Sequence, residues 1–114
     1  ADLVAKRLRN MDTNRHKVFV AAENNLVIGF VHAELYQLLY QEDSINVLGL
    51  AVSNHSQGKG CGRKLMQAVE AWAKEMNCSS VRLNSEVSRA GAHCFYEKIG
   101  YKNTKSQKRF SKVL

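Results

Sequence analysis

A nearly continuous apolar run, a glycine-rich loop and an amphipathic helix follow one another in the middle of this sequence. The run INVLGLAVS (45–53) is long and apolar enough to predict a central strand that is covered on both faces. The segment 65–76 repeats apolar residues at helical spacing and carries charged residues between them. The strand-like segment VRLNS (81–85) comes next. This order predicts a right-handed parallel crossover from Ile45 to Ser85.

The residues before this unit predict a helix and a hairpin. Apolar residues at helical spacing indicate a short amphipathic helix within the first dozen residues. KVFVAA (17–22) and LVIGFVHAELY (26–36) are strand-like, and the ENN between them is typical of a hairpin connection. The alternation of the second strand places three side chains on one of its faces: Phe30, His32 and Glu34.

The residues after the central helix predict one more helix and further strands. Asn77 is expected to end the central helix in a left-handed conformation. Ser88 is expected to cap the final helix, and Gly100 is expected to close it. The segment 101–114 is expected to supply one or two terminal strands. The fold class is therefore α/β or α+β, with a mixed sheet flanked by helices in a single domain over residues 1–114.

Composition limits the classes of protein to which the chain can belong. A length of 114 residues allows one domain at most, and 45% of apolar residues is ordinary for a globular chain. No apolar stretch is long enough to span a bilayer, and no signal-peptide pattern opens the sequence. Because Cys61, Cys78 and Cys94 lack CxxC spacing, we expect no disulfide framework, no metal site and a cytoplasmic location.

The charge of the chain favours an anionic partner. The formal net charge is +7, and six basic residues gather near the C-terminus, at Lys98, Lys102, Lys105, Lys108, Arg109 and Lys112. Such a balance suits nucleic acid, a membrane surface or a phosphorylated cofactor, and it equally suits a merely solubilising surface. A sheet that binds RNA would also need interleaved aromatic residues, which this chain lacks. We therefore expect no specific nucleic-acid site and no membrane binding.

The loop SQGKGCGRKL (56–65) departs from two well-known phosphate loops. The Walker pattern GxxxxGK[ST] is absent. The dinucleotide fingerprint GxGxxG is met at Gly58 and Gly60, but Arg63 stands where the third glycine belongs, and SNHSQ separates the loop from the strand. Glu86 follows the next strand, where an acid would bind a ribose, so this interpretation stays as an alternative.

The physical chemistry of the loop still favours a phosphate group. A loop that enters a helix leaves backbone N–H groups unpaired, and glycines allow a ligand to approach them closely. The positive end of the helix dipole, with Lys59, Arg63 and Lys64 close by, favours a pyrophosphate. A tight strand-to-helix turn with exposed lysines would give the same pattern.

Two motifs in this chain resemble the signatures of the GNAT superfamily of N-acetyltransferases. QGKGCG (57–62) matches the pattern [Q/R]xxGx[G/A] after an apolar strand, and RAGAHCFYEKIGYK (89–102) looks like the family's final helix. The resemblance covers most of the chain from Lys17 onward. It implies a mixed, mostly antiparallel sheet with a central parallel pair of strands that splay apart. It also implies a chain shortened at its N-terminus, without the family's first strand and first helix.

The resemblance implies that the chain binds acetyl-CoA. Backbone amides of the loop would hold the pyrophosphate, namely those of Gln57, Gly58, Lys59, Gly60, Cys61, Gly62 and Arg63. The pantetheine arm would lie along Leu50, Ala51 and Val52 as an added strand, and the amide of Val52 would donate to the acyl oxygen. Arg89 stands where many relatives have asparagine, so it would reach the cofactor's phosphates or remain an exposed residue of the first turn.

The resemblance also implies a set of catalytic roles. Tyr96 matches the tyrosine that protonates the departing thiolate, although a tyrosine there also suits helix packing. Glu34 is the first candidate for the general base, while His32, Glu86 and water remain alternatives. Asn46 stands near the position of a glutamate found in some members. Cys61 is interpreted as a small loop residue, because direct transfer needs no acyl-enzyme.

These observations together predict an acetyl-CoA-dependent N-acetyltransferase that acts directly on a primary amine. The alternative is a non-catalytic CoA-binding module of the same fold that serves as a sensor or a scaffold. The acceptor amine and a homodimeric state are left open by the sequence, because the fold does not determine the substrate.

Overall fold

The computed structural model describes residues 2–114, which form two compact units, residues 2–84 and residues 85–114. The first unit contains the helices and strands α1 (Asp2–Arg9), β1 (His16–Glu23), β2 (Leu26–Tyr36), β3 (Ser44–Val52), α2 (Cys61–Glu75) and β4 (Ser80–Leu83), with a 3-10 turn at Asn54–Ser56. The second unit contains α3 (Ala90–Lys98). Among the helices of the described residues, none is both long and apolar enough to cross a membrane.

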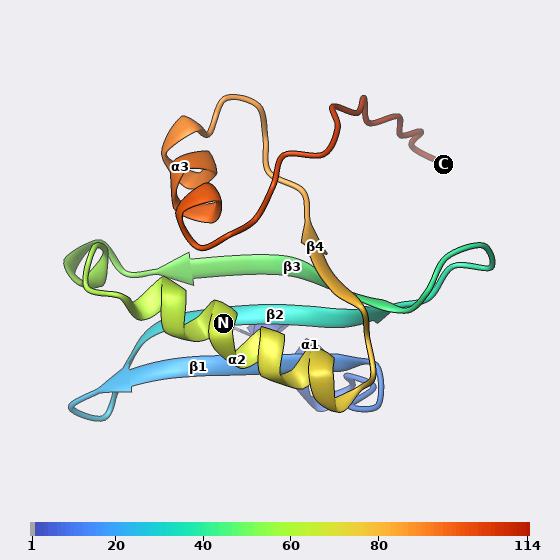
Figure 1. Cartoon of the computed structure of the whole chain (residues 1–114). Coiled ribbons are helices and arrows are strands. Elements are labelled where there is room, and N and C mark those ends of the chain that lie inside the picture. The colour runs from blue at the N-terminus through green and yellow to red at the C-terminus, as the bar shows by residue number, and fades with distance from the viewer. Residues whose placement is uncertain (1) are drawn as a thin grey trace. The chain divides into compact units, whose positions relative to one another are not determined.

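The strands of the first unit form one sheet in the order β1-β2-β3-β4 (Figure 1). β1 and β2 pair antiparallel, as do β2 and β3, whereas β3 and β4 pair parallel. The parallel pair is connected through α2. The mixed, mostly antiparallel sheet and the crossover predicted from the sequence are therefore confirmed.

A tight turn fixes the β1–β2 hairpin. Asn24 and Asn25 both have positive φ angles, 52° and 64°, which asparagine tolerates better than most residues. The register shifts between Ala21 and Ala22, so that Ile28 on β2 is an extra residue. Because of this extra residue, each β1 side chain before Ala22 shares a face with a different set of β2 side chains than the turn alone would dictate. The bulge brings His16 onto the same face of the sheet as Glu34, its register partner.

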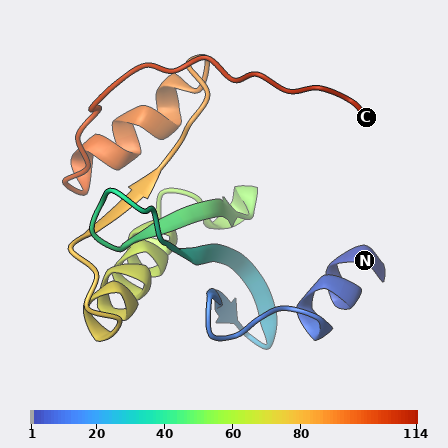
Figure 2. The ribbon, with the colours of Figure 1, turned by 90° about the vertical axis from the view of Figure 1, so that its right-hand side faces the viewer.

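α2 covers one face of the sheet and forms the core with it (Figures 1 and 2). Val31, Ala33, Ile45 and Val47 point to this face from β2 and β3, and Leu65, Met66, Val69, Trp72 and Ala73 meet them from α2. The helix begins at Cys61, four residues before the first apolar position of the predicted helix. Asn77 has a φ of 58°, which confirms the left-handed conformation expected after this helix.

α3 begins later than the sequence suggested. Arg89, not Ser88, occupies the N-cap position, and no side chain caps the helix. The Arg89 amide donates to the Glu86 carbonyl oxygen at 3.0 Å, so a turn precedes the helix and leaves Ser88 outside it. The prediction of a Ser88 cap was therefore wrong. Gly100 follows the helix with a φ of 101°, as expected of a glycine that closes it.

The expectation of terminal strands over 101–114 was also wrong, because this segment contains neither helix nor strand. Its apolar residues are few and do not alternate, and Phe110 and Val113 are 89% and 98% exposed. In addition, the basic residues of this segment repel one another. A segment that buries so little apolar surface gains too little to offset the conformational entropy that ordering costs.

Candidate functional site

β3 separates from β4 at a bulge in the middle of the strand. Pairing of β3 with β4 ends at Val47, which lies opposite Leu83. On the other side of β3, His32 of β2 pairs with Gly49 while Ala33 pairs with Val47, so Leu48 is an extra residue. A bulge bends and twists the strand that carries it, and here it coincides with the end of parallel pairing. The rest of β3, from Leu48 to Val52, has no strand partner on the β4 side within the described residues.

The open edge presents backbone groups of Leu50 and Val52. The Ser53 amide donates to the Ile28 carbonyl oxygen at 2.8 Å, so Ser53 and Ile28 are a hydrogen-bonded pair of the β2–β3 ladder. In an antiparallel ladder such pairs alternate with pairs whose N–H and C=O groups point outward. Leu50 and Val52 are of the outward kind. The Val52 carbonyl oxygen accepts a hydrogen bond from Gln57 Nε2 at 3.1 Å, so the loop is fastened to the end of this edge.

The glycine loop leads directly from this edge into α2. Gly58 and Gly60 have φ angles of 81° and 83°, which L side chains rarely adopt. A Cβ atom built on either glycine would meet no atom within 4 Å, so their outer side is uncovered. The first helical bond runs from the Lys64 amide to the Gly60 carbonyl oxygen at 3.1 Å. The helix therefore supplies no partner for the three preceding amides, those of Cys61, Gly62 and Arg63.

Cys61 is buried beneath the loop rather than displayed on it. Its Sγ atom would lie 3.1 Å from a Cβ atom built at Gly29, and the Ala51 carbonyl oxygen would lie at 3.0 Å. Gly29 thus lets the start of α2 approach β2 closely. The thiol of Cys61 therefore packs against β2.

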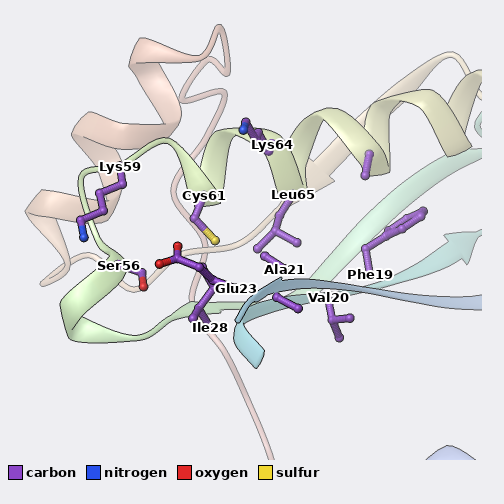
Figure 3. Close-up of a pocket in the computed structure, with 12 residues that line it drawn as sticks. Phe19, Val20, Ala21, Glu23, Ile28, Ser56, Lys59, Cys61, Lys64 and Leu65 are labelled. Carbon is purple, nitrogen blue, oxygen red and sulfur yellow. The ribbon is translucent and has the colours of Figure 1, made fainter. Parts of the chain in front are cut away.

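A cavity of about 400 Å³ lies between α2 and β1 and is lined in part by residues of the loop. Cys61 and Leu65 point toward it from α2, and the Glu23 side chain points into the same space (Figure 3). The carboxylate of Glu23 would repel a phosphate. A second cavity of about 280 Å³ lies over the paired ends of β2 and β3, and its lining includes Phe30, Ala51 and Val52. The second cavity suits the arm of a ligand better than the first.

A row of polar side chains crosses the sheet on the face opposite α2. His16, Glu34, Asn46 and Arg82 are successive register partners on β1, β2, β3 and β4. Arg82 Nη1 donates to Asn46 Oδ1 at 2.9 Å, and Asn46 Nδ2 donates to Glu34 Oε2 at 2.9 Å. Arg82 also lies 4.7 Å from the centre of the Tyr36 ring. The amide of Asn46 thereby joins a cation to a carboxylate and holds one oxygen of Glu34.

His32 lies next to this row and contacts a second histidine. His16 Nδ1 and His32 Nε2 are 3.0 Å apart in a half-buried hydrogen bond. Burial lowers the pKa of His32 below its usual value, the charge of His16 lowers it further, and Glu34 raises it. The imidazole of His32 is therefore neutral near neutral pH, with a lone pair available.

Three of the predicted site residues belong to the second unit. Tyr96 lies on α3, where its ring contacts those of Phe95 and Tyr101 edge-on, at 5.2 and 6.2 Å between centroids. Burial raises the pKa of Tyr96 above its usual value, and the charge of Arg89 partly opposes this. The phenol of Tyr96 therefore keeps its proton at neutral pH. Glu86 and Arg89 are exposed in the turn that precedes α3.

The structure adds residues that the sequence analysis did not single out for a site. His16 and Arg82 were not chosen, and Asn46 was noted only as a departure from the family. The bulge at Leu48 left one trace in the sequence, the glycine that follows it at position 49. A glycine inside a strand is itself a sign of a bulge or a close approach.

The comparisons with known proteins agree with this geometry. The model of the acetyltransferase (GNAT) domain matches residues 14–103, which is most of the chain. The chain therefore belongs to the GNAT acetyltransferase family. Its fold is also that of the aminoglycoside N-acetyltransferase AAC(6')-Iy in complex with the bisubstrate analogue CoA-S-monomethyl-acetylneamine. That likeness has a TM-score of 0.87 at 16% identity and covers 97% of this chain and 78% of that one.

The matches to two curated relatives cover a smaller share of the relative's length. N-acetylaspartate synthetase of Homo sapiens is 27% identical over 85 residues, which is 75% of this chain and 27% of that protein. Aminoglycoside N(6')-acetyltransferase type 1 of Stenotrophomonas maltophilia is 34% identical over 56 residues, which is 49% of this chain and 37% of that protein. The matched part of the chain thus spans 27% and 37% of the lengths of these two relatives.

Proposed function

We propose that this chain binds acetyl-CoA and transfers the acetyl group directly to a primary amine. The observation that carries the proposal is the open edge of β3, which runs straight into a glycine loop at the start of α2. An edge with outward N–H and C=O groups suits an amide-containing arm, and a helix start with unpaired amides suits a pyrophosphate. The two sites lie end to end in the chain, as the two parts of coenzyme A do in the molecule.

In this proposal, each part of acetyl-CoA is assigned to a group of residues. Gln57, Gly58, Lys59, Gly60, Cys61, Gly62 and Arg63 would hold the pyrophosphate with their backbone amides. Leu50, Ala51 and Val52 would hold the pantetheine arm, with the cavity beside Val52 to receive its apolar part. The Val52 amide would donate to the acyl oxygen, where negative charge develops as the amine attacks. Arg89 is proposed to reach the phosphates from the second unit.

Two proton transfers must accompany the reaction. An alkylammonium has a pKa of about 10.4, so the acceptor must lose a proton before it attacks the thioester. Glu34 and His32 share the face on which we place the acceptor, and Glu34 keeps one carboxylate oxygen that Asn46 does not bind. Tyr96 is proposed to give its hydroxyl proton to the departing thiolate. Burial raises its pKa, and the phenol carries its proton at neutral pH, as a proton donor must.

The names of the relatives support a cationic amine as the acceptor class. Two of them act on aminoglycosides, which carry several ammonium groups. Glu34 places a carboxylate on the same face. The free thiols of Cys61, Cys78 and Cys94 support a reducing, cytoplasmic setting.

Calorimetric titration with acetyl-CoA, followed by an assay of free thiol release with a panel of amines, tests the proposal. We expect binding of acetyl-CoA and thiol release that depends on at least one amine. Binding without release for any amine would favour the sensor or scaffold alternative. Tight binding of NAD, with none of coenzyme A, would show that the loop is a dinucleotide site instead.

A further inference from the structure

The strongest feature that the proposed function leaves unexplained is the contact between His16 and His32. Histidines 16 residues apart in the chain meet across β1 and β2 with ring nitrogens 3.0 Å apart, and their ring centroids are 5.1 Å apart. The meeting depends on the bulge at Ile28, which turns His16 to this face. Both rings are half-buried. A direct imidazole–imidazole hydrogen bond lets a proton enter at one ring and leave at the other.

The surroundings of His32 leave one side of its ring open toward the bulge of β3. Its register partner on β3 is Gly49, which has no side chain. A Cβ atom built at Gly49 would meet only the Phe30 ring, at 4.0 Å. Gly49 itself therefore places no side chain between His32 and the edge that we assign to the thioester. His32 is therefore the titratable side chain of β2 nearest in register to that edge.

Glu34 is less suited to take the proton than its position suggests. Its Oε2 atom accepts from Asn46, which in turn accepts from Arg82. One of the two carboxylate oxygens of Glu34 is therefore already occupied, and this network fixes the orientation of its carboxylate. Its negative charge remains useful for attracting an ammonium group. We therefore assign the binding of the ammonium group to Glu34 and the removal of its proton to another residue.

We propose that His32 and His16 form a two-imidazole proton relay, in which His32 is the general base for the acceptor amine and His16 carries the proton to water. This inference rests on the proposed acetyl transfer and assigns the proton acceptor that the transfer needs. Glu34 attracts the ammonium group of the acceptor, and Asn46 and Arg82 hold Glu34 in place.

Neutral His32 holds its proton on Nε2 and donates it to Nδ1 of His16, which leaves the Nδ1 lone pair of His32 free. That lone pair takes a proton from the ammonium of the acceptor, which becomes a neutral amine. The Nε2 proton of His32 passes to Nδ1 of His16, and His16 releases its own Nε2 proton to water. The net result is an amine and one solvated proton.

Two neighbouring side chains, His16 and Glu34, act on the charge state of His32, and each allows a directional test. His16 acts on His32 from β1 and Glu34 acts from β2, while Gly49 on β3 contributes no side chain. Replacing His16 by asparagine removes the repulsion of a second imidazolium, so the pKa of His32 should rise. The Glu34→Gln variant removes an attraction, so that pKa should fall further.

The first experiment is a proton NMR titration of the histidine ring signals in the whole chain. We expect His16→Asn to raise the pKa of His32 and Glu34→Gln to lower it. Lys17→Gln is the matched control, because Lys17 is an exposed cation next to His16 on the opposite face of β1. It should leave the His32 titration unchanged. If the pKa of His32 is the same in His16→Asn and in the wild type, the two rings are not coupled and the relay is overturned.

The second experiment is single-turnover acetyl transfer across pH. We expect His32→Gln to lower the rate by roughly 10²–10⁴, and imidazole added to His32→Ala to restore part of it. His16→Asn should cause a smaller loss and move the acid limb of the pH profile upward, which a purely structural role would not do. Full rates in both histidine variants would overturn the relay alone. A wild type that transfers no acetyl group would overturn both the relay and the proposed function.

Discussion

At the scale of single residues, Tyr96 illustrates how packing and chemistry can favour the same side chain. Its ring contacts Phe95 and Tyr101, while its backbone carbonyl oxygen accepts from the Tyr101 amide at 2.9 Å. The same burial raises the pKa of its hydroxyl and keeps the proton in place. A role in packing alone and a role as a general acid therefore differ only in what the hydroxyl does.

Replacing Tyr96 by phenylalanine keeps the ring and removes that hydroxyl. We expect the single-turnover rate of acetyl transfer to fall by roughly 10²–10⁴, the usual contribution of a positioned general acid. The affinity for acetyl-CoA, measured by calorimetry, should change little, because the loop and the β3 edge are proposed to supply most of the binding. A collapsed melting temperature with an unchanged rate would instead assign Tyr96 to packing.

His32 links the polar face of the sheet to the stability of the fold. Its pKa is lowered in the folded chain, mainly by burial, so below pH 6.5 the unfolded chain binds a proton that the folded chain resists. The contribution of His32 to stability is therefore present above this pH and is lost as the pH falls toward and below the folded pKa.

We expect the free energy of unfolding of the wild type to fall as the pH is lowered from about 7 to about 5, and to fall less in His32→Gln. Urea unfolding at a series of pH values measures the difference between the two slopes. Replacing the exposed His55 by glutamine is the matched control and should keep the slope of the wild type. Identical slopes for His32→Gln and the wild type would contradict the lowered pKa.

At the scale of elements, the loop between β3 and α2 combines two requirements in a few residues. Gly58 and Gly60 adopt left-handed backbone conformations, and their missing side chains leave the outer side of the loop uncovered. The left-handed conformations avoid backbone strain only with glycine, and the missing side chains allow a ligand to approach the loop. One substitution at Gly60 can test both, because nothing in the described residues fills the space where its Cβ would lie.

Gly60→Val should cost about 1–3 kcal/mol of stability through backbone strain and should abolish the stabilisation by acetyl-CoA. In the wild type, that stabilisation should reach about 2.7 kcal/mol at a hundredfold excess over the dissociation constant. Thermal unfolding with and without acetyl-CoA gives both values. Gly91→Ala, in an open helical position, is the control and should keep the acetyl-CoA effect. A full acetyl-CoA effect in Gly60→Val would exclude the loop as the binding site.

The elements also show where the sequence was sufficient and where it was not. The apolar run of β3 and the stripe of α2 are local patterns, so the crossover and the covered face followed from them. The polar row did not, because it depends on a bulge at Ile28 and on register across four strands. His16 looks like a turn residue in the sequence and becomes a neighbour of His32 only through that register. Likewise, the spacing of Ser88 suggested a cap, but the turn at 86–89 moved the helix start beyond it.

At the scale of the whole molecule, charge is the property that most easily suggests a wrong partner. The formal net charge is +7, and Lys105, Lys108, Arg109 and Lys112 lie exposed in a segment without helix or strand. A phosphate-bearing substrate also benefits from this field, since it raises the local concentration of anions. The same field attracts nucleic acid without any specific site.

We predict that binding to DNA or RNA is weak and is lost steeply with salt, because it arises from the release of counterions. Fluorescence anisotropy with labelled duplexes at increasing salt concentrations measures the dependence. Replacing the four basic residues of the terminal segment by glutamine should reduce the slope with salt and leave acetyl-CoA binding nearly unchanged. Sequence-specific, nanomolar binding at physiological salt would contradict this account.

The central claim is that the β3 edge, the loop and the polar face act together in acetyl transfer to an amine. The most direct measurement is a single-turnover reaction of the purified chain with isotopically labelled acetyl-CoA and a panel of amines that includes aminoglycosides. Mass spectrometry then follows the label. The account predicts that the label appears on the nitrogen of a primary amine, at a rate that falls in Tyr96→Phe and His32→Gln. Acetyl-CoA that stays intact with every amine while it binds tightly, or label that appears on no amine, would contradict it.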